Sequence, residues 1–276
     1  PECIPVRDRG SMSTIVITGS TQGIGRGLAK EFCSRGHNVV VAGRNAERVA
    51  ETVAALEQEA GGAAGQPCDV SVQPQVQTLW NLASERFGSV DIWINYAGLA
   101  RTVWPILDVP QEEIETMVHT NMLGTINGCR VAASGMVKQG QGKLFNILGG
   151  GSDGEYFPGL GIYGTTKRGL DYFTNALVKE LADTPVVIGK IRPGMIITEA
   201  VIREAKTDPA GFEKSRKMMN KLVDTVETVA PFLVDRILAT DKSGTKIHWL
   251  NGGKMAGRML VGMIRKRPDQ FEQFGL

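Results

Sequence analysis

Two side chains that can exchange a proton lie four residues apart in the segment YGTTK at residues 163–167. At 3.6 residues per turn, a helix brings both groups onto one face, about 6 Å apart along its axis. A lysine cation beside a phenol favours the phenolate, so Lys167 is expected to lower the pKa of Tyr163 from its usual value of about 10. The pair therefore predicts general acid–base catalysis near neutral pH.

A glycine-rich turn, TGSTQGIG, occupies residues 18–25. It joins a β-branched run, Thr14–Thr18, to a stretch with helical periodicity, Ile24–Ser34. Glycines let the backbone approach a pyrophosphate closely, and the N–H groups and dipole at a helix start favour its negative charge. This placement predicts a dinucleotide site, whereas the alternative is an ordinary turn without a ligand. The predicted cofactor residues of the turn are Gly19, Ser20, Thr21, Gln22, Gly23, Ile24 and Gly25.

The residues that follow the second predicted strand, Asn38–Ala42, indicate which nicotinamide cofactor binds. An acid there would accept a hydrogen bond from the ribose 2′-hydroxyl, whereas an arginine would pair with a 2′-phosphate. Arg44 follows this strand and no acid does, which favours NADP(H) over NAD(H). Arg44 could instead be a solvated residue at a helix start. Asp69, with Val70 beside it, ends the third strand and is expected to reach the adenine edge.

Short β-branched runs alternate with helix-period stretches, which predicts βαβ units and one doubly wound α/β domain over residues 12–252. The expected strands are Thr14–Thr18, Asn38–Ala42, a strand ending near Cys68, Asp91–Asn95, Gly142–Leu148, Val186–Arg192 and Lys246–Leu250. The expected helices are Ile24–Ser34, Ala46–Ala60, Gln111–Met136, Tyr163–Leu181 and Thr225–Ala239, with a turn over Gly61–Gln66.

Composition narrows the class of protein. The 276 residues carry a formal net charge of +2, which gives no reason to expect nucleic acid as a partner. Residues 1–11 show no periodicity, and we interpret them as a remnant of cloning. Outside residues 1–11 the cysteines are odd in number and widely separated, so no disulfide framework is expected. The histidines are scattered, so no metal site is expected either. No apolar run approaches the roughly 20 residues that a membrane span needs.

The motifs taken together resemble the short-chain dehydrogenase/reductase family over residues 14–252. They are TGSTQGIG, YGTTK, Asn95-Tyr96-Ala97-Gly98 where the family usually has Asn-Asn-Ala-Gly, Asn121-Met122-Leu123-Gly124, and Arg192-Pro193-Gly194-Met195 followed by Thr198. The resemblance implies a single-domain Rossmann fold whose seven-stranded parallel sheet has the order 3-2-1-4-5-6-7, with helices on both faces. It also implies an oxidoreductase that uses NAD(P)(H) on alcohol or carbonyl groups. A homodimer or homotetramer would pack through Gln111–Met136 and Tyr163–Leu181.

The resemblance also implies roles for individual residues. Asn95, Ala97 and Gly98 would line the adenosine and ribose side of the cofactor. Asn121 would hold a proton-relay water near Lys167, and Lys167 would also bind the nicotinamide ribose beside Tyr163. The residues that would border the nicotinamide are Pro193, Gly194, Ile196 and Thr198.

The serine of the family's site is displaced. The family places it 13 residues before the tyrosine, where this sequence has Gly150. Ser152, within the segment NILGGGSDG, is the nearest serine. A glycine-rich loop could lift Ser152 into the same place, where it would stabilise a developing oxyanion beside Tyr163. The alternative is that Ser152 is an ordinary loop residue and that catalysis is poor or absent.

The glycine-rich segment before a displaced serine resembles the chlorophyll b reductase branch of the family. That branch uses a reduced nicotinamide cofactor to convert the C7 formyl group of chlorophyll b to a hydroxymethyl group. The resemblance therefore favours an NADPH-dependent reductase of a carbonyl on a bulky apolar substrate. One alternative is an alcohol dehydrogenase acting on a sterol-, retinoid- or polyol-like substrate. Another is a non-catalytic protein that senses NADP(H).

Two further segments are expected to contact, respectively, the substrate and either a membrane surface or a neighbouring subunit. The segment Glu199–Leu222 follows the Pro-Gly motif and is expected to cover the substrate. The C-terminal extension, residues 253–276, contains a basic amphipathic stretch at Lys254–Arg267. Such a helix could lie on a membrane surface or pack on a neighbouring subunit. The expected location is the cytoplasm or the plastid stroma, with possible peripheral contact to a membrane.

Overall fold

The computed structural model describes residues 12–264 and 267–276, and it contains one seven-stranded sheet. All neighbouring strands are parallel, and the order β3-β2-β1-β4-β5-β6-β7 confirms the predicted topology. The strands are β1 (Thr14–Thr18), β2 (Asn38–Gly43), β3 (Ala63–Pro67), β4 (Ile92–Asn95), β5 (Gly142–Ile147), β6 (Val186–Arg192) and β7 (Lys246–His248).

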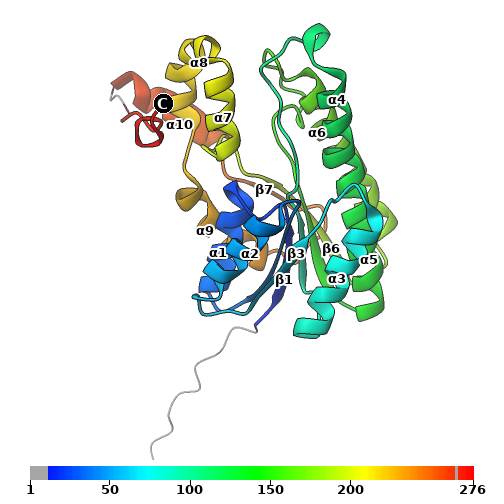
Figure 1. The fold of residues 1–276 in the computed structure, drawn as a ribbon. Coiled ribbons are helices and arrows are strands. Elements are labelled where there is room, and N and C mark those ends of the chain that lie inside the picture. Colours follow the sequence, from blue (N-terminus) through cyan, green and yellow to red (C-terminus); the bar gives the residue numbers. More distant parts are fainter. Residues whose placement is uncertain (1–11, 265–266) are drawn as a thin grey trace, which may run out of the picture.

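Helices cover both faces of this sheet (Figure 1). The helices are α1 (Gly23–Ser34), α2 (Ala46–Leu56), α3 (Gln73–Phe87), α4 (Gln111–Met117), α5 (Gly124–Gln139), α6 (Gly161–Glu180), α7 (Glu199–Thr207), α8 (Pro209–Leu222), α9 (Val226–Leu238) and α10 (Gly252–Ile264). One core packs α1, α2 and α9 on one face, and a second core packs α3, α5 and α6 on the other. Within the described residues, no helix is long and apolar enough to cross a membrane.

Strand β1 lies in the interior of the sheet and is buried on both of its faces. Ile15 and Ile17 of β1 belong to the core under α1, whereas Val16 belongs to the core under α3 and α5. All three are fully buried, as expected for a parallel strand with helices above and below it. Strands β2 and β3 extend the sheet on one side of β1, whereas β4 and the later strands extend it on the other. Such a switch point opens a crevice at the carboxyl ends of the strands.

Two elements differ from the sequence prediction in the region of β3. The turn predicted over Gly61–Gln66 is wrong, because residues from Ala63 onward pair with β2 in parallel register. Backbone hydrogen bonding at the sheet edge outweighs the low strand propensity of AAGQP. Helix α3 was not predicted at all. Its polar residues outnumber its buried ones, Val76, Leu79 and Ala83, so its apolar periodicity is weak.

The single helix expected over Gln111–Met136 is interrupted. Between α4 and α5, residues Val118–Leu123 form a π-helical segment with a wider turn. Asn121 lies in this segment and is fully buried. Widened turns of this kind re-aim side chains and often occur at functional sites.

The C-terminal extension packs against the body of the protein. Asp224, whose side chain is only 4% exposed, forms ion pairs with Arg258 of α10 and with Arg267. Lys254 stacks over the ring of Trp249. These three cations are therefore engaged within the chain, whereas the sequence suggested a basic face that would meet either a membrane or a neighbouring subunit. Arg265 and Lys266, which the sequence also placed on that face, lie outside the described residues.

Candidate functional site

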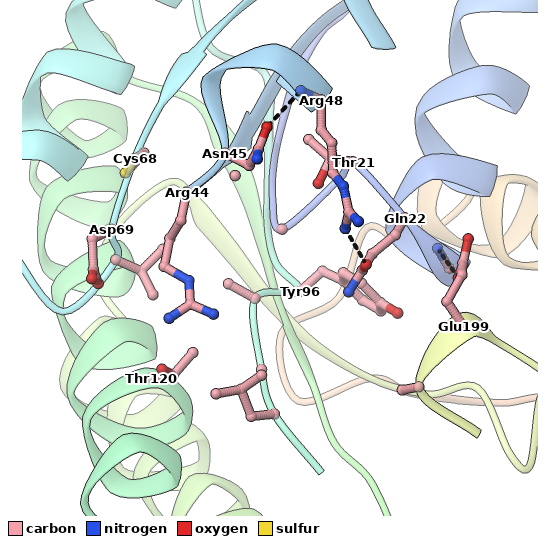
Figure 2. Close-up of a pocket in the computed structure, with 18 of the residues that line it drawn as sticks. Thr21, Gln22, Arg44, Asn45, Arg48, Cys68, Asp69, Tyr96, Thr120 and Glu199 are labelled. Atoms are coloured by element: carbon pink, nitrogen blue, oxygen red, sulfur yellow. Dashed lines mark hydrogen bonds between the residues drawn. The ribbon is translucent and has the colours of Figure 1, made fainter. Parts of the chain in front are cut away.

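A pocket opens at the carboxyl ends of β1 and β2, next to the glycine-rich turn (Figure 2). Ten predicted cofactor residues line it: Gly19, Thr21, Gln22, Gly23, Arg44, Asp69, Val70, Ala97, Gly98 and Thr198. They come from segments that are far apart in the sequence and that the sheet brings together. The remaining lining residues are Gly43, Asn45, Arg48, Cys68, Tyr96, Leu99, Thr120, Glu199 and Ala200.

The turn itself needs glycine and one buried serine. Gly19 has φ +69°, and a Cβ there would lie 2.7 Å from Cα of Ala97. The turn therefore approaches the segment after β4 more closely than any side chain would allow. The hydroxyl of Ser20 donates to the Ile17 carbonyl at 2.7 Å and accepts from the Ala42 N–H at 3.1 Å. Ser20 thus fixes the turn and does not line the pocket.

The adenosine end of the pocket carries two arginines. Figure 2 shows the guanidinium of Arg44 projecting from the end of β2 into the pocket. Arg44 makes no hydrogen bond or ion pair with any described residue, so its charge is available to a ligand. Arg48, one helical turn later, donates to the Gln22 side chain at 3.3 Å. Asp69 lies on the other side of the pocket, where its carboxylate accepts hydrogen bonds from both the N–H and the hydroxyl of Ser71.

The start of α1 is occupied by two side chains of the protein. The Glu199 carboxylate accepts a hydrogen bond from the Gly23 N–H at 2.9 Å. The Tyr96 hydroxyl accepts from the N–H groups of Ile24 and Gly25, and burial raises its pKa to about 12. A helix start with free N–H groups is an anion site. Glu199 therefore places a negative charge where a pyrophosphate is expected to bind.

Two buried asparagines, Asn95 and Asn121, form hydrogen bonds that fix the backbone and side chains next to the pocket. Asn95 accepts from the Trp93 indole at 2.8 Å and donates to Asn146 at 2.9 Å. Its side chain therefore points into the core, and Asn95 is not among the residues that line the pocket. Asn121 accepts from the Leu99 N–H at 2.7 Å and donates to the Leu99 carbonyl at 2.9 Å. This reciprocal pair fixes the segment after Gly98.

Tyr163 and Lys167 lie together on α6, as predicted. The Lys167 ammonium is 5.7 Å from the centre of the Tyr163 ring and donates to the Ile147 carbonyl at 3.0 Å. Burial lowers the pKa of Lys167 to about 8. The pKa of Tyr163 is raised, chiefly by desolvation and then by the Tyr96 and Glu204 side chains. The prediction of a lowered tyrosine pKa is thus wrong for this structure, because desolvation is the largest influence and it raises the pKa.

The segment before Tyr163 keeps one serine hydroxyl buried. Ser152 is fully buried, and its Oγ has no hydrogen-bond partner among the described residues. Arg168 of α6 donates to the Ser152 carbonyl at 2.9 Å, which ties the loop to the helix that carries Tyr163 and Lys167. Gly149, not Gly150, lies against the Tyr163 hydroxyl, because a Cβ at Gly149 would overlap that oxygen. An unsatisfied buried hydroxyl close to this helix is what an incoming carbonyl oxygen could engage.

The segment expected to border the nicotinamide is divided between pocket and core. Thr198 lines the pocket, whereas Ile196 is buried and bridges to Asp224. Gly194 adopts φ +84°, and its close approach to Leu250 leaves no room for a side chain. Pro193 and Gly194 therefore shape the path of the chain from β6 towards α7 and are not among the lining residues.

Comparison with known proteins decides the family. The profile of the short chain dehydrogenase family matches residues 13–209. The chain belongs to this family. As a short-chain dehydrogenase it is an oxidoreductase that acts on carbonyl or alcohol groups with a nicotinamide cofactor.

Several relatives of this short-chain dehydrogenase carry names. It is 38% identical to the chloroplastic chlorophyll(ide) b reductase NOL of Arabidopsis thaliana, over 92% of this chain and 75% of that protein. It is 33% identical to the probable chlorophyll(ide) b reductase NYC1 of the same plant, over 94% of this chain but only 54% of that protein. The chain thus spans about half the length of NYC1. A solved structure of an actinorhodin polyketide ketoreductase variant with NADPH matches 87% of the chain, with a TM-score of 0.78 and 25% identity.

Sequence reasoning missed three residues of the short-chain dehydrogenase site. Arg48 follows Arg44 by four residues, a spacing that places both on one side of a helix start and that could have been recognised. Tyr96 was noticed only as a departure from the family pattern. Glu199 gave no sequence signal, because its contact with Gly23 spans 176 positions.

Proposed function

We propose that this short-chain dehydrogenase is an NADPH-dependent reductase that converts the formyl group of a chlorophyll b-type pigment to a hydroxymethyl group. The observation that carries the reaction class is the pairing of Tyr163 with the buried Lys167 on α6. The loop tied to this helix adds the hydroxyl of Ser152, which has no hydrogen-bond partner among the described residues. A phenol beside a lysine cation is suited to protonate an alkoxide.

The pocket residues fit an NADP cofactor. The unpartnered guanidinium of Arg44 and the neighbouring Arg48 provide positive charge where a 2′-phosphate would lie. Gly19 keeps the turn close to the segment after β4, and displacement of Glu199 would free the Gly23 N–H at the start of α1 for a pyrophosphate. When bound, the reduced nicotinamide supplies a hydride. Replacement of Arg44 by alanine should weaken NADPH binding by about tenfold or more and leave NADH binding nearly unchanged, since a charged hydrogen bond contributes about 1.5–3 kcal/mol.

The protein's own groups would manage the oxygen and the proton. As the carbonyl carbon gains a hydride and its π electrons move to oxygen, Ser152 Oγ donates a hydrogen bond to that oxygen. Tyr163 then transfers its phenolic proton to the oxygen, which completes the alcohol. The Lys167 ammonium stabilises the phenolate that remains. Asn121 holds the backbone next to Lys167, where a proton from solvent restores the phenol.

The relatives support the pigment as substrate. Both named plant relatives are described as chlorophyll(ide) b reductases, and each is matched over more than nine-tenths of this chain. Their chloroplastic description supports a plastid location for a protein of this kind. Exposed apolar side chains near the start of α6 also suit an apolar macrocycle. Ile106 packs against Gly161, and Ile106, Leu107, Tyr156 and Phe157 are all more than half exposed.

Two other functions fit less well. An alcohol dehydrogenase working oxidatively would use the same Tyr163 and Lys167 in reverse, and the description of the plant relatives as reductases favours reduction. A non-catalytic sensor of NADP(H) would have no use for the buried lysine beside the tyrosine, whose desolvation costs free energy.

The direct test is incubation of the protein with chlorophyll b and NADPH, followed by pigment chromatography. We expect the 7-hydroxymethyl product with wild type and a loss of about a hundredfold or more in rate with Tyr163→Phe, because the proton donor is removed. Lack of pigment reduction together with rapid reduction of a small aldehyde would overturn the substrate and leave the reductase chemistry. Equal rates for wild type and Tyr163→Phe would overturn the mechanism.

A further inference from the structure

A second carboxylate lies on the substrate side of the site. Glu204 is on α7, and its Oε2 accepts a hydrogen bond from the Thr102 hydroxyl at 2.6 Å. Its other oxygen, Oε1, is buried without a partner; within the described residues, only Ser152 Oγ shares that condition. Thr102 packs against Gly159 in the loop that leads into α6. Glu204 is thus held between α7 and the loop that precedes Tyr163.

The nearby cations do not satisfy this oxygen. Arg101 is committed to Glu113, in an ion pair of 3.0 Å. Arg203, next to Glu204 on α7, is exposed; it interacts electrostatically with Glu204 but forms no hydrogen bond or ion pair with it. The negative charge of Glu204 instead acts on the reacting group, since it contributes to the raised pKa of Tyr163. A desolvated carboxylate oxygen costs free energy until a positive centre or a hydrogen-bond donor meets it. Since no group of the described residues meets this oxygen, its partner is a ligand.

On the basis of the proposed function, we infer that Glu204 recognises the magnesium of a chlorophyll-type substrate through its free carboxylate oxygen. The periphery of chlorophyll b consists of hydrocarbon, ester, ketone and formyl groups, which at most accept hydrogen bonds. The central magnesium is its electropositive centre, and magnesium prefers oxygen ligands. Because Oε1 is closed to solvent, α7 opens to admit the pigment and closes when the oxygen meets the metal. Glu204 is thereby a specificity residue, which selects the metallated pigment.

The test compares chlorophyll b with pheophytin b, the same pigment without magnesium, in wild type, Glu204→Gln and Thr102→Val. Glutamine keeps an oxygen for the Thr102 hydroxyl but replaces the free oxygen and its charge by an NH₂ group. Valine removes only the bond that holds the carboxylate. Dissociation constants are measured by pigment absorption without cofactor, and kcat/KM by chromatography with NADPH. Thermal unfolding of each variant checks that it is folded.

We expect wild type to prefer chlorophyll b by about tenfold or more in both measurements, equivalent to one ligand bond of modest strength. Glu204→Gln should lose this preference through weaker use of chlorophyll b alone, whereas Thr102→Val should affect the two pigments equally. Equal use of the two pigments by wild type, or equal losses on both in Glu204→Gln, would overturn the inference and leave the proposed function standing. Failure to bind either pigment would overturn both.

Discussion

The contact between Gly149 and Tyr163 allows a sharp test of the catalytic geometry. A Cβ at position 149 would overlap the Tyr163 hydroxyl, well inside the 3.0 Å that real Cβ atoms keep from their neighbours. The next glycine differs, because a Cβ at Gly150 would meet only Leu160, at 3.3 Å. Gly149→Ala should therefore push the hydroxyl aside by about 1 Å, a displacement that costs about a hundredfold in rate. In free energy this is about 2.7 kcal/mol of transition-state stabilisation.

The assay is the initial rate of NADPH oxidation with a saturating aldehyde, with Gly150→Ala as the matched control. The control should retain a rate within about threefold of wild type, because its only new contact is with a flexible leucine end. Both variants should bind NADPH as wild type does, since neither position lines the cofactor pocket. Equal rates for the two variants would refute the assignment of Tyr163 as proton donor in its observed position.

Three other changes have defined outcomes. Ser152→Ala should lower kcat by about a hundredfold, and a second change, Gly150→Ser, should restore part of it; full activity in the single variant would remove Ser152 from the site. Because the pKa of Lys167 is lowered to about 8, its cation is present below pH 8 and is lost above it. The reduction rate should therefore fall as the pH rises through 8, and Lys167→Arg should move this fall to higher pH, where guanidinium stays charged; identical pH profiles would contradict this. Glu199→Gln should tighten NADPH binding by about fivefold in a fluorescence titration, because a neutral acceptor holds the start of α1 less strongly by about 1 kcal/mol; unchanged or weaker binding would show that Glu199 does not compete with the cofactor.

The sequence was sufficient for the topology and for the position of the cofactor turn. The strands that were predicted most accurately, such as β1 and β6, are β-branched and buried on both faces, so composition alone reveals them. The end of strand β3 near Cys68 was predicted but its start was not, because its Ala and Gly residues have low strand propensity and pair with β2. The π-helical turn at Asn121 likewise depends on packing between α4, α5 and α6.

At the candidate site, the sequence predicted the shared helix face of Tyr163 and Lys167 but not the electrostatics of the pair. The spacing of Tyr163 and Lys167 gave their shared face, whereas the raised pKa of the tyrosine depends on desolvation and on Glu204, which lies on a distant segment. Arg44 was recognised from its place after β2, and the structure shows it without a partner in the pocket. The basic C-terminal stretch illustrates the opposite case. The helical periodicity indicates that Arg258 and Arg267 face solvent, yet both form ion pairs with the buried Asp224.

Transfer of a labelled hydride tests the central claim most directly. Chlorophyll b is incubated in the dark with the wild-type protein and NADPH carrying deuterium at the transferable position, and the pigment is then analysed by mass spectrometry. We predict one deuterium in the product, on the carbon of the new 7-hydroxymethyl group, and no product in the absence of the protein. A 7-hydroxymethyl product without deuterium, or recovery of unchanged chlorophyll b from a protein that binds NADPH, would contradict it.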